Sequence, residues 1–595
     1  MQNKAASNPA GATEAPLGAH AAALPDVVPP EARFRSALGL AAVAVFVSAV
    51  FGLLFFRETA LSYSIGYNLY GATRVLNGEV PYRDFHTLYP PATVYLNALL
   101  FNAFGISLYT ALLGVCVFKV LTSITIYLCA KRLMTLSWAL AATGFSVIWL
   151  RPNGPFKAVP MHYGGLFLAL SLLFVLRYID GRRVANLFAA GVSIGVLALF
   201  KHNIGAYALI GFSLFLVFRG NPLGLRFERL AILVRSAGMM LLGVVLPIFP
   251  VLAYMHYQGA LKAMGRTLLF GPGEFLFSRL AATPSPLAPA LMALILGGVA
   301  VVVYWLHLKP AVKTILAGLA LISILSFVIL APEGAANQIV FYAPVIAIVS
   351  AGVACRLLEA RDENAGRQLC AVSIVAAAAF MESFPRFARE QSIASMPFIG
   401  LLTVFILFTF REPILNRTGA KLAGQIAIAA LPVAIFLLGA RFFAQTFFDK
   451  GLHMRSNTGL SSTRGRGVYF PSEAASEIDG VVAFVQQQVA EGGYIFAQSY
   501  AGSSYLFLAD RRNPSGAQFW GGVGVTKAER EQTLRSIQEK DVRLVITSDR
   551  DMAGERYKPM SEFLQNQFKP TARFGEVLIL ERVLKGGQLD TPISN

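Results

Sequence analysis

The stretch 78-GEVPYRDFHTLYPP-91 sets two carboxylates, an arginine and a histidine among aromatic residues and prolines. Long apolar runs lie on both sides of it, from Ser36 to Phe56 and over residues 107–130. A helix needs about 20 apolar residues to cross a bilayer, and ionisable side chains are costly inside one. The stretch therefore predicts a stiff polar loop at the membrane edge of a membrane protein.

The composition of the whole chain supports this interpretation. Of the 595 residues, 55% are hydrophobic and only 14% are charged. Apolar runs recur along the first three quarters of the chain and predict about thirteen spanning helices. Beyond the first run, the candidate spans are residues 107–130, 134–150, 161–178, 185–200, 203–218, 231–255, 287–307, 312–331, 339–358, 369–384, 397–410 and 422–442. The predicted fold is a polytopic α-helical membrane protein.

Lysine and arginine in the loops predict the orientation. With the N-terminus in the cytoplasm, the basic loops lie inside, as the positive-inside rule requires. An odd number of spans then places the 78–91 stretch and everything after residue 443 on the opposite side. Residues 1–33 are rich in Ala and Pro and predict a disordered cytoplasmic tail. We therefore expect a membrane domain over residues 34–443 and an external domain over residues 444–595.

The distribution of charge and of cysteines argues against a nucleic-acid-binding protein and against a disulfide-rich or cysteine-metal protein. The formal net charge of +18 is spread over cytoplasmic loops rather than gathered in one domain, so nucleic-acid binding is not expected. All four cysteines, Cys116, Cys129, Cys355 and Cys370, fall in or beside predicted spans. No disulfide framework or cysteine metal site is therefore implied.

The chain after residue 443 has a different pattern. Helical patterns cover residues 472–490, 526–540 and 558–568, and strand patterns cover residues 494–498, 543–548 and 576–582. Helices alternating with strands predict a small α/β domain. It contains no G-x-G-x-x-G, P-loop or H-E-x-x-H motif, so we expect it to bind or cover rather than to catalyse.

The external loops bring ionisable residues of both signs to one side of the membrane. Carboxylates in the first loop, Glu58 and Asp84 among them, would face cations from later turns. Those cationic and titratable residues are Arg151, Lys157, His162, Lys201, His202 and Arg266. Such a set suits a reaction in which a base removes a proton while cations hold a departing anion.

The run 66-GYNLYGATRVLNGEVPYRDFHTLYPPATVYLNALLFNAFG-105 resembles the first external loop of GT-C-type integral membrane glycosyltransferases. Similar stretches are 163-YGGLFLALSLLFVLRY-178, 199-LFKHNIGAY-207, 338-QIVFYAPVIAIVSAG-352 and 574-FGEVLILER-582. The resemblance, which extends to aminoarabinose and protein mannosyl transferases, implies a polyprenyl-phosphate sugar donor. It also implies the inner membrane of a bacterium, with the C-terminal domain in the periplasm.

The catalytic base is where the sequence departs from the family. Members commonly carry an acidic residue just before a G-Y-Y-L-Y-like run, and this sequence has Ser64 there. Asp84 is the first candidate to replace it, because prolines stiffen its loop. Glu58, directly after the first span, is the second. Alternatively, Asp84 pairs with Arg83 or caps a helix that begins near Ala92.

Binding roles follow from the same chemistry. Lys201 and His202 interrupt two apolar spans and are expected to hold the donor phosphate, unless Lys201 merely reaches out to lipid headgroups. Tyr82, Tyr89 and Tyr342 could stack against the sugar or the isoprenoid, although interfacial tyrosines are routine in membrane proteins. Arg83 and His86 are further substrate-binding candidates. Arg151, Lys157, His162 and Arg266 are weaker candidates, because a solvated charge in a loop needs no explanation. No metal site is predicted, although a divalent cation near Glu79, Asp84 and His86 is left open.

The expected function is transfer of a monosaccharide, with inversion, from a polyprenyl-phosphate donor to a periplasmic lipid, glycan or protein acceptor. Three alternatives remain. A transporter or flippase would have as many spans, but usually shows an internal repeat and midplane charges. A lipid-linked glycan ligase would transfer a whole oligosaccharide. A scaffold that has lost its base is the third.

Overall fold

The computed structural model describes residues 30–55, 61, 63–150, 158–218, 226–269, 362–383, 389–417, 457–498, 502–517, 525–553 and 558–583, with isolated positions between 309 and 355 and between 436 and 444. The predicted spans at residues 287–307, 312–331, 339–358 and 422–442 fall outside these ranges or meet them only at isolated positions. The other predicted spans can be compared directly.

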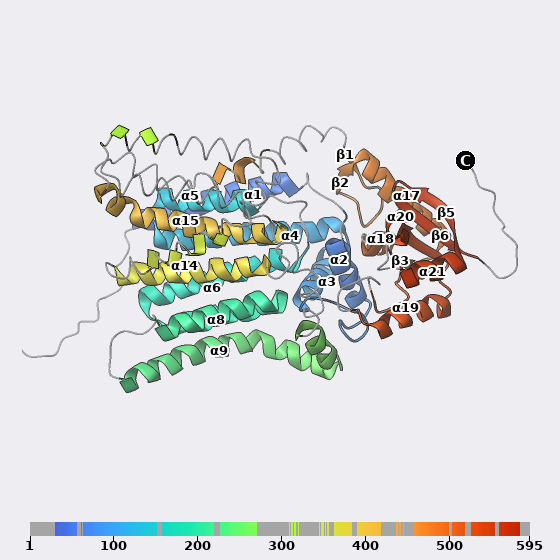
Figure 1. The fold of residues 1–595 in the computed structure, drawn as a ribbon, viewed down its shortest axis with the longest axis horizontal. Coiled ribbons are helices and arrows are strands. Elements are labelled where there is room, and N and C mark those ends of the chain that lie inside the picture. Colours follow the sequence, from blue (N-terminus) through green and yellow to red (C-terminus); the bar gives the residue numbers. More distant parts are fainter. Residues whose placement is uncertain are drawn as a thin grey trace, which may run out of the picture.

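Each predicted apolar run in the described part of the chain is helical. These helices pack against one another with their long axes in a common direction (Figure 1). They are α1 (Pro30–Phe55), α4 (Leu108–Leu133), α5 (Leu136–Leu150), α6 (Pro160–Gly181), α7 (Val184–Phe200), α8 (His202–Phe218), α9 (Arg226–Tyr257), α14 (Glu363–Phe380) and α15 (Arg389–Arg417). Among the described residues, four helices are long and apolar enough to cross a membrane, and further apolar helices are shorter. The total of about thirteen spans stays a prediction.

Small residues let α7 and α9 approach closely. A Cβ atom added at Gly191 would lie 2.0 Å from the carbonyl oxygen of Met240, and one added at Gly195 would lie 2.5 Å from that of Val244. Glycine removes the side chain that would keep the two backbones apart, which is how helices pack tightly where the surroundings are apolar. The 191-GVSIG-195 segment is therefore fixed by packing.

Two shorter helices belong to the segment predicted as the first external loop. They are α2 (Tyr63–Leu76) and α3 (Ala92–Phe104), and the polar stretch of residues 78–91 connects them. The helix expected near Ala92 is confirmed, whereas α2 was not anticipated. Figure 1 places both helices between the bundle of long helices and the C-terminal region, residues 457–583.

The C-terminal region contains a four-stranded mixed sheet. Its order is β3-β4-β6-β5, with β3 parallel to β4 and the other neighbours antiparallel. The strands are β3 (Ile495–Ala497), β4 (Leu544–Ser548), β5 (Phe568–Phe574) and β6 (Val577–Arg582). The predicted strands at 494–498, 543–548 and 576–582 are confirmed, as are the helices α17 (Ser472–Gln488), α19 (Lys527–Glu539) and α21 (Lys558–Gln567). Strand β5 and helix α18 (Gly502–Ala509) were missed.

The two faces of this sheet bury different neighbours, because successive side chains of a strand point to opposite sides. Val545 and Leu580 share a core with residues of α19 and α21. Ile546 and Ile579 belong to the larger core that includes α17, α18 and the membrane helices. The sheet is thus joined to the helical bundle through α18.

Helix α18 rests directly on α2 and α3. All of its residues are buried. A Cβ atom added at Gly66 in α2 would lie 2.2 Å from the backbone nitrogen of Ser504, and the rings of Phe101 and Phe507 stack with centroids 5.7 Å apart. A second contact lies at the start of α4, where the carbonyl of Arg464 accepts a 2.8 Å hydrogen bond from the backbone of Leu108. These contacts fix the C-terminal region against the first loop.

Candidate functional site

Buried tyrosines hold the loop between α2 and α3 in shape. The Tyr67 hydroxyl donates to the carbonyl of His86 at 3.0 Å and accepts from the backbone nitrogen of Leu88 at 2.7 Å. The Tyr82 hydroxyl donates to the carbonyl of Tyr89 at 2.6 Å. These bonds give hydrogen-bond partners to backbone groups that would otherwise be buried without one. The loop is therefore preorganised by hydrogen bonds as well as by its prolines.

Asp84 is held by its neighbour Arg83. The carboxylate accepts from Arg83 Nε at 2.9 Å and Nη2 at 2.7 Å, and from the backbone nitrogen of Val80 at 2.7 Å. The pairing considered from the sequence is thus observed. The Arg83 guanidinium, helped by the Val80 N–H, holds the pKa of Asp84 below its usual value despite partial burial. Arg83 also donates to Gln258 Oε1 at 2.9 Å, which ties the loop to the end of α9.

Arg74 connects the loop to the C-terminal region. Its Nε and Nη2 lie 2.7 Å and 2.5 Å from Oε2 of Glu79. It also donates to the carbonyls of Ser515 and Asp84, both at 3.1 Å, and lies 4.8 Å from the ring centroid of Phe85. Its side chain is only 8% exposed. Arg74 was not predicted as a site residue, and the structure shows it organising the backbone around Asp84.

A polar cavity of about 360 Å³ lies between this loop and the C-terminal region. It joins candidates predicted from distant parts of the sequence, because Arg83 and Asp84 share it with Arg266 of the 261–269 helix. The backbone nitrogen of His86 donates to the carbonyl of Gly516 at 2.9 Å and so closes one edge. The walls are Tyr82, Arg83, Asp84, Phe85, His86, Ala263, Arg266, Thr267, Ser515, Gly516, Ala517, Thr526, Glu529 and Gln532.

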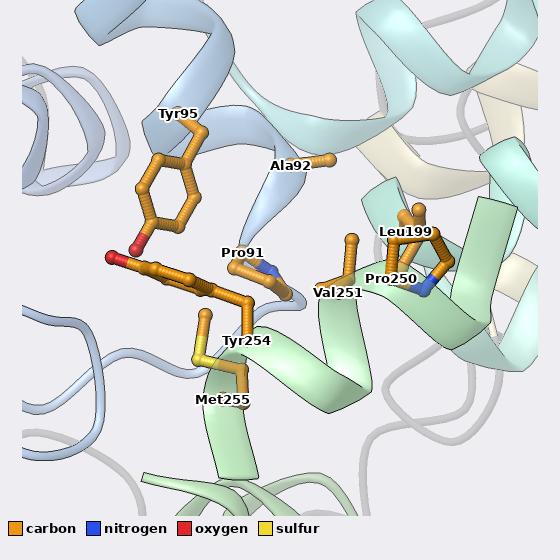
Figure 2. A pocket seen from close by; sticks show the side chains of 8 residues that line it. All are labelled: Pro91, Ala92, Tyr95, Leu199, Pro250, Val251, Tyr254 and Met255. Carbon is orange, nitrogen blue, oxygen red and sulfur yellow. The ribbon is translucent and has the colours of Figure 1, made fainter. Parts of the chain in front are cut away.

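An apolar cavity of about 270 Å³ lies beside the same loop (Figure 2). Its walls come from the start of α3, the end of α7 and the last turns of α9. The rings of Tyr95 and Tyr254 meet edge to face with centroids 6.1 Å apart. The walls are Pro91, Ala92, Tyr95, Leu199, Pro250, Val251, Tyr254 and Met255. Apart from the two phenols, this surface offers nothing but hydrocarbon and a thioether.

Lys201 lies at the break between α7 and α8, as predicted. Its Nζ is 3.4 Å from Oε1 of Glu382 and 4.8 Å from the ring centroid of Tyr89. The side chains of Lys201 and Glu382 are 14% and 7% exposed. Lys201 therefore does not extend to lipid headgroups. Glu382, in the short helix η1 (Met381–Ser383), was missed, although a single carboxylate at the end of an apolar run is the signal that would have found it.

Three buried polar atoms, on Glu382 and on the two residues that follow Lys201, have no hydrogen-bond partner among the described residues. They are Oε2 of Glu382, Nδ1 of His202 and Oδ1 of Asn203. A hydrogen bond with the backbone of Leu268 holds the His202 side chain. Buried polar atoms are nearly always paired, so each of these atoms has a capacity for hydrogen bonding that no described residue uses.

The remaining predicted residues are placed differently. Glu58, Arg151, Lys157 and Tyr342 lie outside the described residues. His162 lies in the first turn of α6 and does not line either cavity.

No metal cluster is seen within the described ranges. There, no three His, Cys, Asp or Glu side chains gather in a way that could hold a metal ion. Glu79 and Asp84 are instead engaged by Arg74 and Arg83. Both carboxylates around which a divalent cation was left open therefore already carry a cationic partner.

Comparison with known proteins gives one kind of match. No protein-family model matches the chain, and no curated protein matches it by sequence. Solved structures do. These matches have TM-scores of 0.36 to 0.44 and 13% to 14% sequence identity.

Three of these structures illustrate the match. The Archaeoglobus fulgidus oligosaccharyltransferase in complex with zinc and sulfate has a TM-score of 0.44 and 14% identity, covering 89% of this chain and 71% of that one. ArnT from Cupriavidus metallidurans bound to undecaprenyl phosphate has a TM-score of 0.42 and 13% identity, covering 93% and 99%. The A. fulgidus oligosaccharyltransferase AglB in complex with an inhibitory peptide and a dolichol-phosphate has a TM-score of 0.42 and 14% identity, covering 94% and 75%.

Proposed function

We propose that this protein is a membrane glycosyltransferase that moves a monosaccharide from a polyprenyl-phosphate donor to a hydroxyl-bearing acceptor. One observation carries the proposal. The segment of residues 82–95, which covers the end of the loop and the first turn of α3, contributes walls to an apolar cavity and to a polar one, and the ring of Tyr89 lies over the buried cation of Lys201. In such a donor the hydrocarbon chain would match the apolar cavity, the phosphate would match Lys201, and the sugar would match the polar cavity.

The donor lipid would use the apolar cavity. Pro91, Leu199 and Val251 offer hydrocarbon walls for the first isoprene units. Lys201 follows Leu199 by two positions and would hold the phosphate. The phosphate leaves as a stable anion, so a fixed cation in low-dielectric surroundings stabilises the transition state without a general acid.

The sugar and the acceptor would use the polar cavity, whose volume of about 360 Å³ falls in the usual range for small-ligand sites. Asp84 would take the proton of the acceptor hydroxyl as its oxygen attacks the anomeric carbon and the phosphate departs, which inverts the configuration. The two bonds from Arg83 keep Asp84 ionised and fix its direction. Glu58 remains the second candidate for the base.

The proposed setting follows the sequence analysis. Residues 34–443 form the membrane domain in the inner membrane of a bacterium, with the N-terminus in the cytoplasm. Residues 444–595 lie in the periplasm and cover the acceptor. This placement is supported by residues of the C-terminal region that line the polar cavity. They are Ser515, Gly516, Thr526, Glu529 and Gln532. The acceptor would be a lipid, a glycan or a protein of the cell envelope.

The test is transfer from radiolabelled polyprenyl-phosphate sugars by the purified protein, Asp84→Asn and Glu58→Gln. Asp549→Asn is the matched control, because Asp549 is also paired with an arginine, Arg573, but on the exposed surface of the C-terminal region. We expect wild-type and control transfer to agree, and Asp84→Asn to lose about 100-fold or more.

The other outcomes decide between alternatives. Loss in Glu58→Gln alone would move the base to Glu58. If the wild type neither binds nor turns over any polyprenyl-phosphate sugar, the proposal fails. Binding of the lipid with movement between leaflets of a vesicle, and without transfer, would establish a flippase instead.

A further inference from the structure

Lys201 and Glu382 form a buried ion pair whose hydrogen bonding is incomplete. It joins the break between α7 and α8 to the end of α14, and both side chains are largely buried, at 14% and 7% exposure. The Nζ–Oε1 distance of 3.4 Å is longer than the 2.7–2.9 Å of a tight charge-assisted hydrogen bond. The second carboxylate oxygen of Glu382 has no partner among the described residues. The pair is therefore incompletely satisfied.

A buried lysine needs a counter-charge. Without one, burial disfavours the ammonium form and the side chain gives up its proton at a lower pH than an exposed lysine. Within the described residues, the titratable groups that face Lys201 are Glu382 from η1, Tyr89 from the first loop and His202 from α8. Only Glu382 supplies a negative charge near neutral pH, since Tyr89 is a phenol and His202 is neutral or cationic.

We propose that Glu382 is a positioning residue for the donor phosphate that acts through Lys201: it keeps Lys201 protonated in the empty enzyme, and shares that cation with the phosphate when the donor binds. This inference rests on the proposed function. Glu382 itself does not touch the reacting atoms. This role predicts that donor binding does not change with pH as long as Glu382 is present, because Lys201 then stays protonated.

The experiment measures binding of undecaprenyl phosphate to the detergent-purified full chain between pH 7.5 and 9.5. The second ionisation of a phosphate monoester, near pH 6, is complete over this range, so the ligand does not titrate. The variants are Glu382→Gln, Lys201→Arg and Lys201→Arg/Glu382→Gln. Arginine stays protonated in proteins and needs no counter-ion to do so.

We expect the wild type to bind with constant affinity across the range. Glu382→Gln should lose affinity as the pH rises, by up to about tenfold for each pH unit above the point where Lys201 gives up its proton. The Lys201→Arg/Glu382→Gln double variant should bind without this pH dependence. It should also bind about tenfold more tightly than Lys201→Arg alone, because a buried negative charge near the phosphate has been removed.

The outcomes separate the inference from the function. Binding by Glu382→Gln that does not change with pH would overturn the inference. A loss of binding at every pH that arginine does not restore would also overturn it, since a purely structural role predicts that result. If Glu382→Gln does not fold, the double variant is compared with Lys201→Arg, and equal or weaker binding by the double variant overturns the inference. If the wild type itself does not bind undecaprenyl phosphate, the proposed function fails as well.

Discussion

Arg83 and Asp84 are neighbours in the sequence and also bond to each other, with Arg83 Nη2 lying 2.7 Å from Asp84 Oδ2. These hydrogen bonds lower the pKa of Asp84. Because the pKa is lower in the folded chain than in the unfolded one, the pair stabilises the loop above the unfolded value, about 3.9, and this contribution is lost as the pH falls through the folded value. We therefore expect kcat/KM for transfer to show no acid limb from Asp84 between pH 5 and 8.

The substitution Arg83→Gln tests whether Arg83 is the cause of the lowered pKa of Asp84. Without the guanidinium, the pKa of Asp84 should rise, so any acid limb in the pH profile of kcat/KM moves to higher pH. Arg573→Gln is the control, because it breaks an exposed Arg–Asp pair in the C-terminal region and should leave the profile unchanged. A wild-type acid limb between pH 5 and 8 that is unaffected by Arg83→Gln would contradict the assignment.

Arg74→Gln should loosen the junction between the loop and the C-terminal region. The substitution leaves Glu79 without its partner and removes the bond to the carbonyl of Ser515. The arginine is buried but a third of the Glu79 side chain is exposed, so breaking this pair and its carbonyl bonds costs about 1–3 kcal/mol. We expect a lower midpoint of thermal unfolding in detergent and faster proteolysis after residue 456. Arg543→Gln breaks a more exposed pair with Glu581 and should cost less than about 1 kcal/mol. Equal effects of the two variants would show that Arg74 has no special role.

Gly66→Ala should separate α18 from α2. The added Cβ atom would lie 2.2 Å from the backbone nitrogen of Ser504, and backbone cannot yield as a flexible side chain does. Overpacking of this kind costs about 1–3 kcal/mol. Gly144→Ala in α5 meets nothing within 4 Å and should leave stability unchanged or slightly higher. Thermal unfolding of both variants is the measurement, and a Gly66→Ala variant as stable as the control would refute the close contact.

Val251→Trp should fill the apolar cavity. An indole at this position in α9 occupies space beside Pro91 and Tyr254 that the isoprenoid of the donor would need. We expect binding of undecaprenyl phosphate to weaken about tenfold or more, while the protein still elutes as a single species. Val234→Trp is the matched control, because Val234 lies on the same helix with 62% of its surface exposed. Undiminished binding by Val251→Trp would place the lipid elsewhere.

The long helices could be predicted from the sequence because hydropathy alone decides them. The run at residues 107–130 became α4, Leu108–Leu133, with its start fixed by Ser107, whose hydroxyl accepts from the backbone of Thr110. Strand β4 was similarly plain, since 543-RLVITS-548 is rich in β-branched residues. Elements that depend on tertiary contacts were missed. Helix α18 has eight residues, all buried, so no face of it shows a period, and β5 contains Pro570 and few apolar residues.

The residues of the candidate site also fall into those that could be predicted from the sequence and those that could not. Asp84, Arg83 and Arg266 were found because charges near predicted spans are conspicuous, and the structure brings them to one cavity. Arg74 and Glu382 were not found. The lone carboxylate at the end of an apolar run could have marked Glu382 as a candidate, but the partner of each residue lies far away in the chain. Glu382 meets Lys201 across 181 positions of sequence and Arg74 meets Ser515 across 441. No local pattern encodes a contact at such separations.

The contact of α18 with α2 also has a consequence for how the protein is made. Ser504 is synthesised long after Gly66, so the two surfaces can pack only when most of the chain has been added. A ribosome that stops before residue 502 would leave the helical bundle without six of the fourteen residues that line the polar cavity. Activity of this protein would therefore report on completed translation, and incomplete chains in the membrane would be inert.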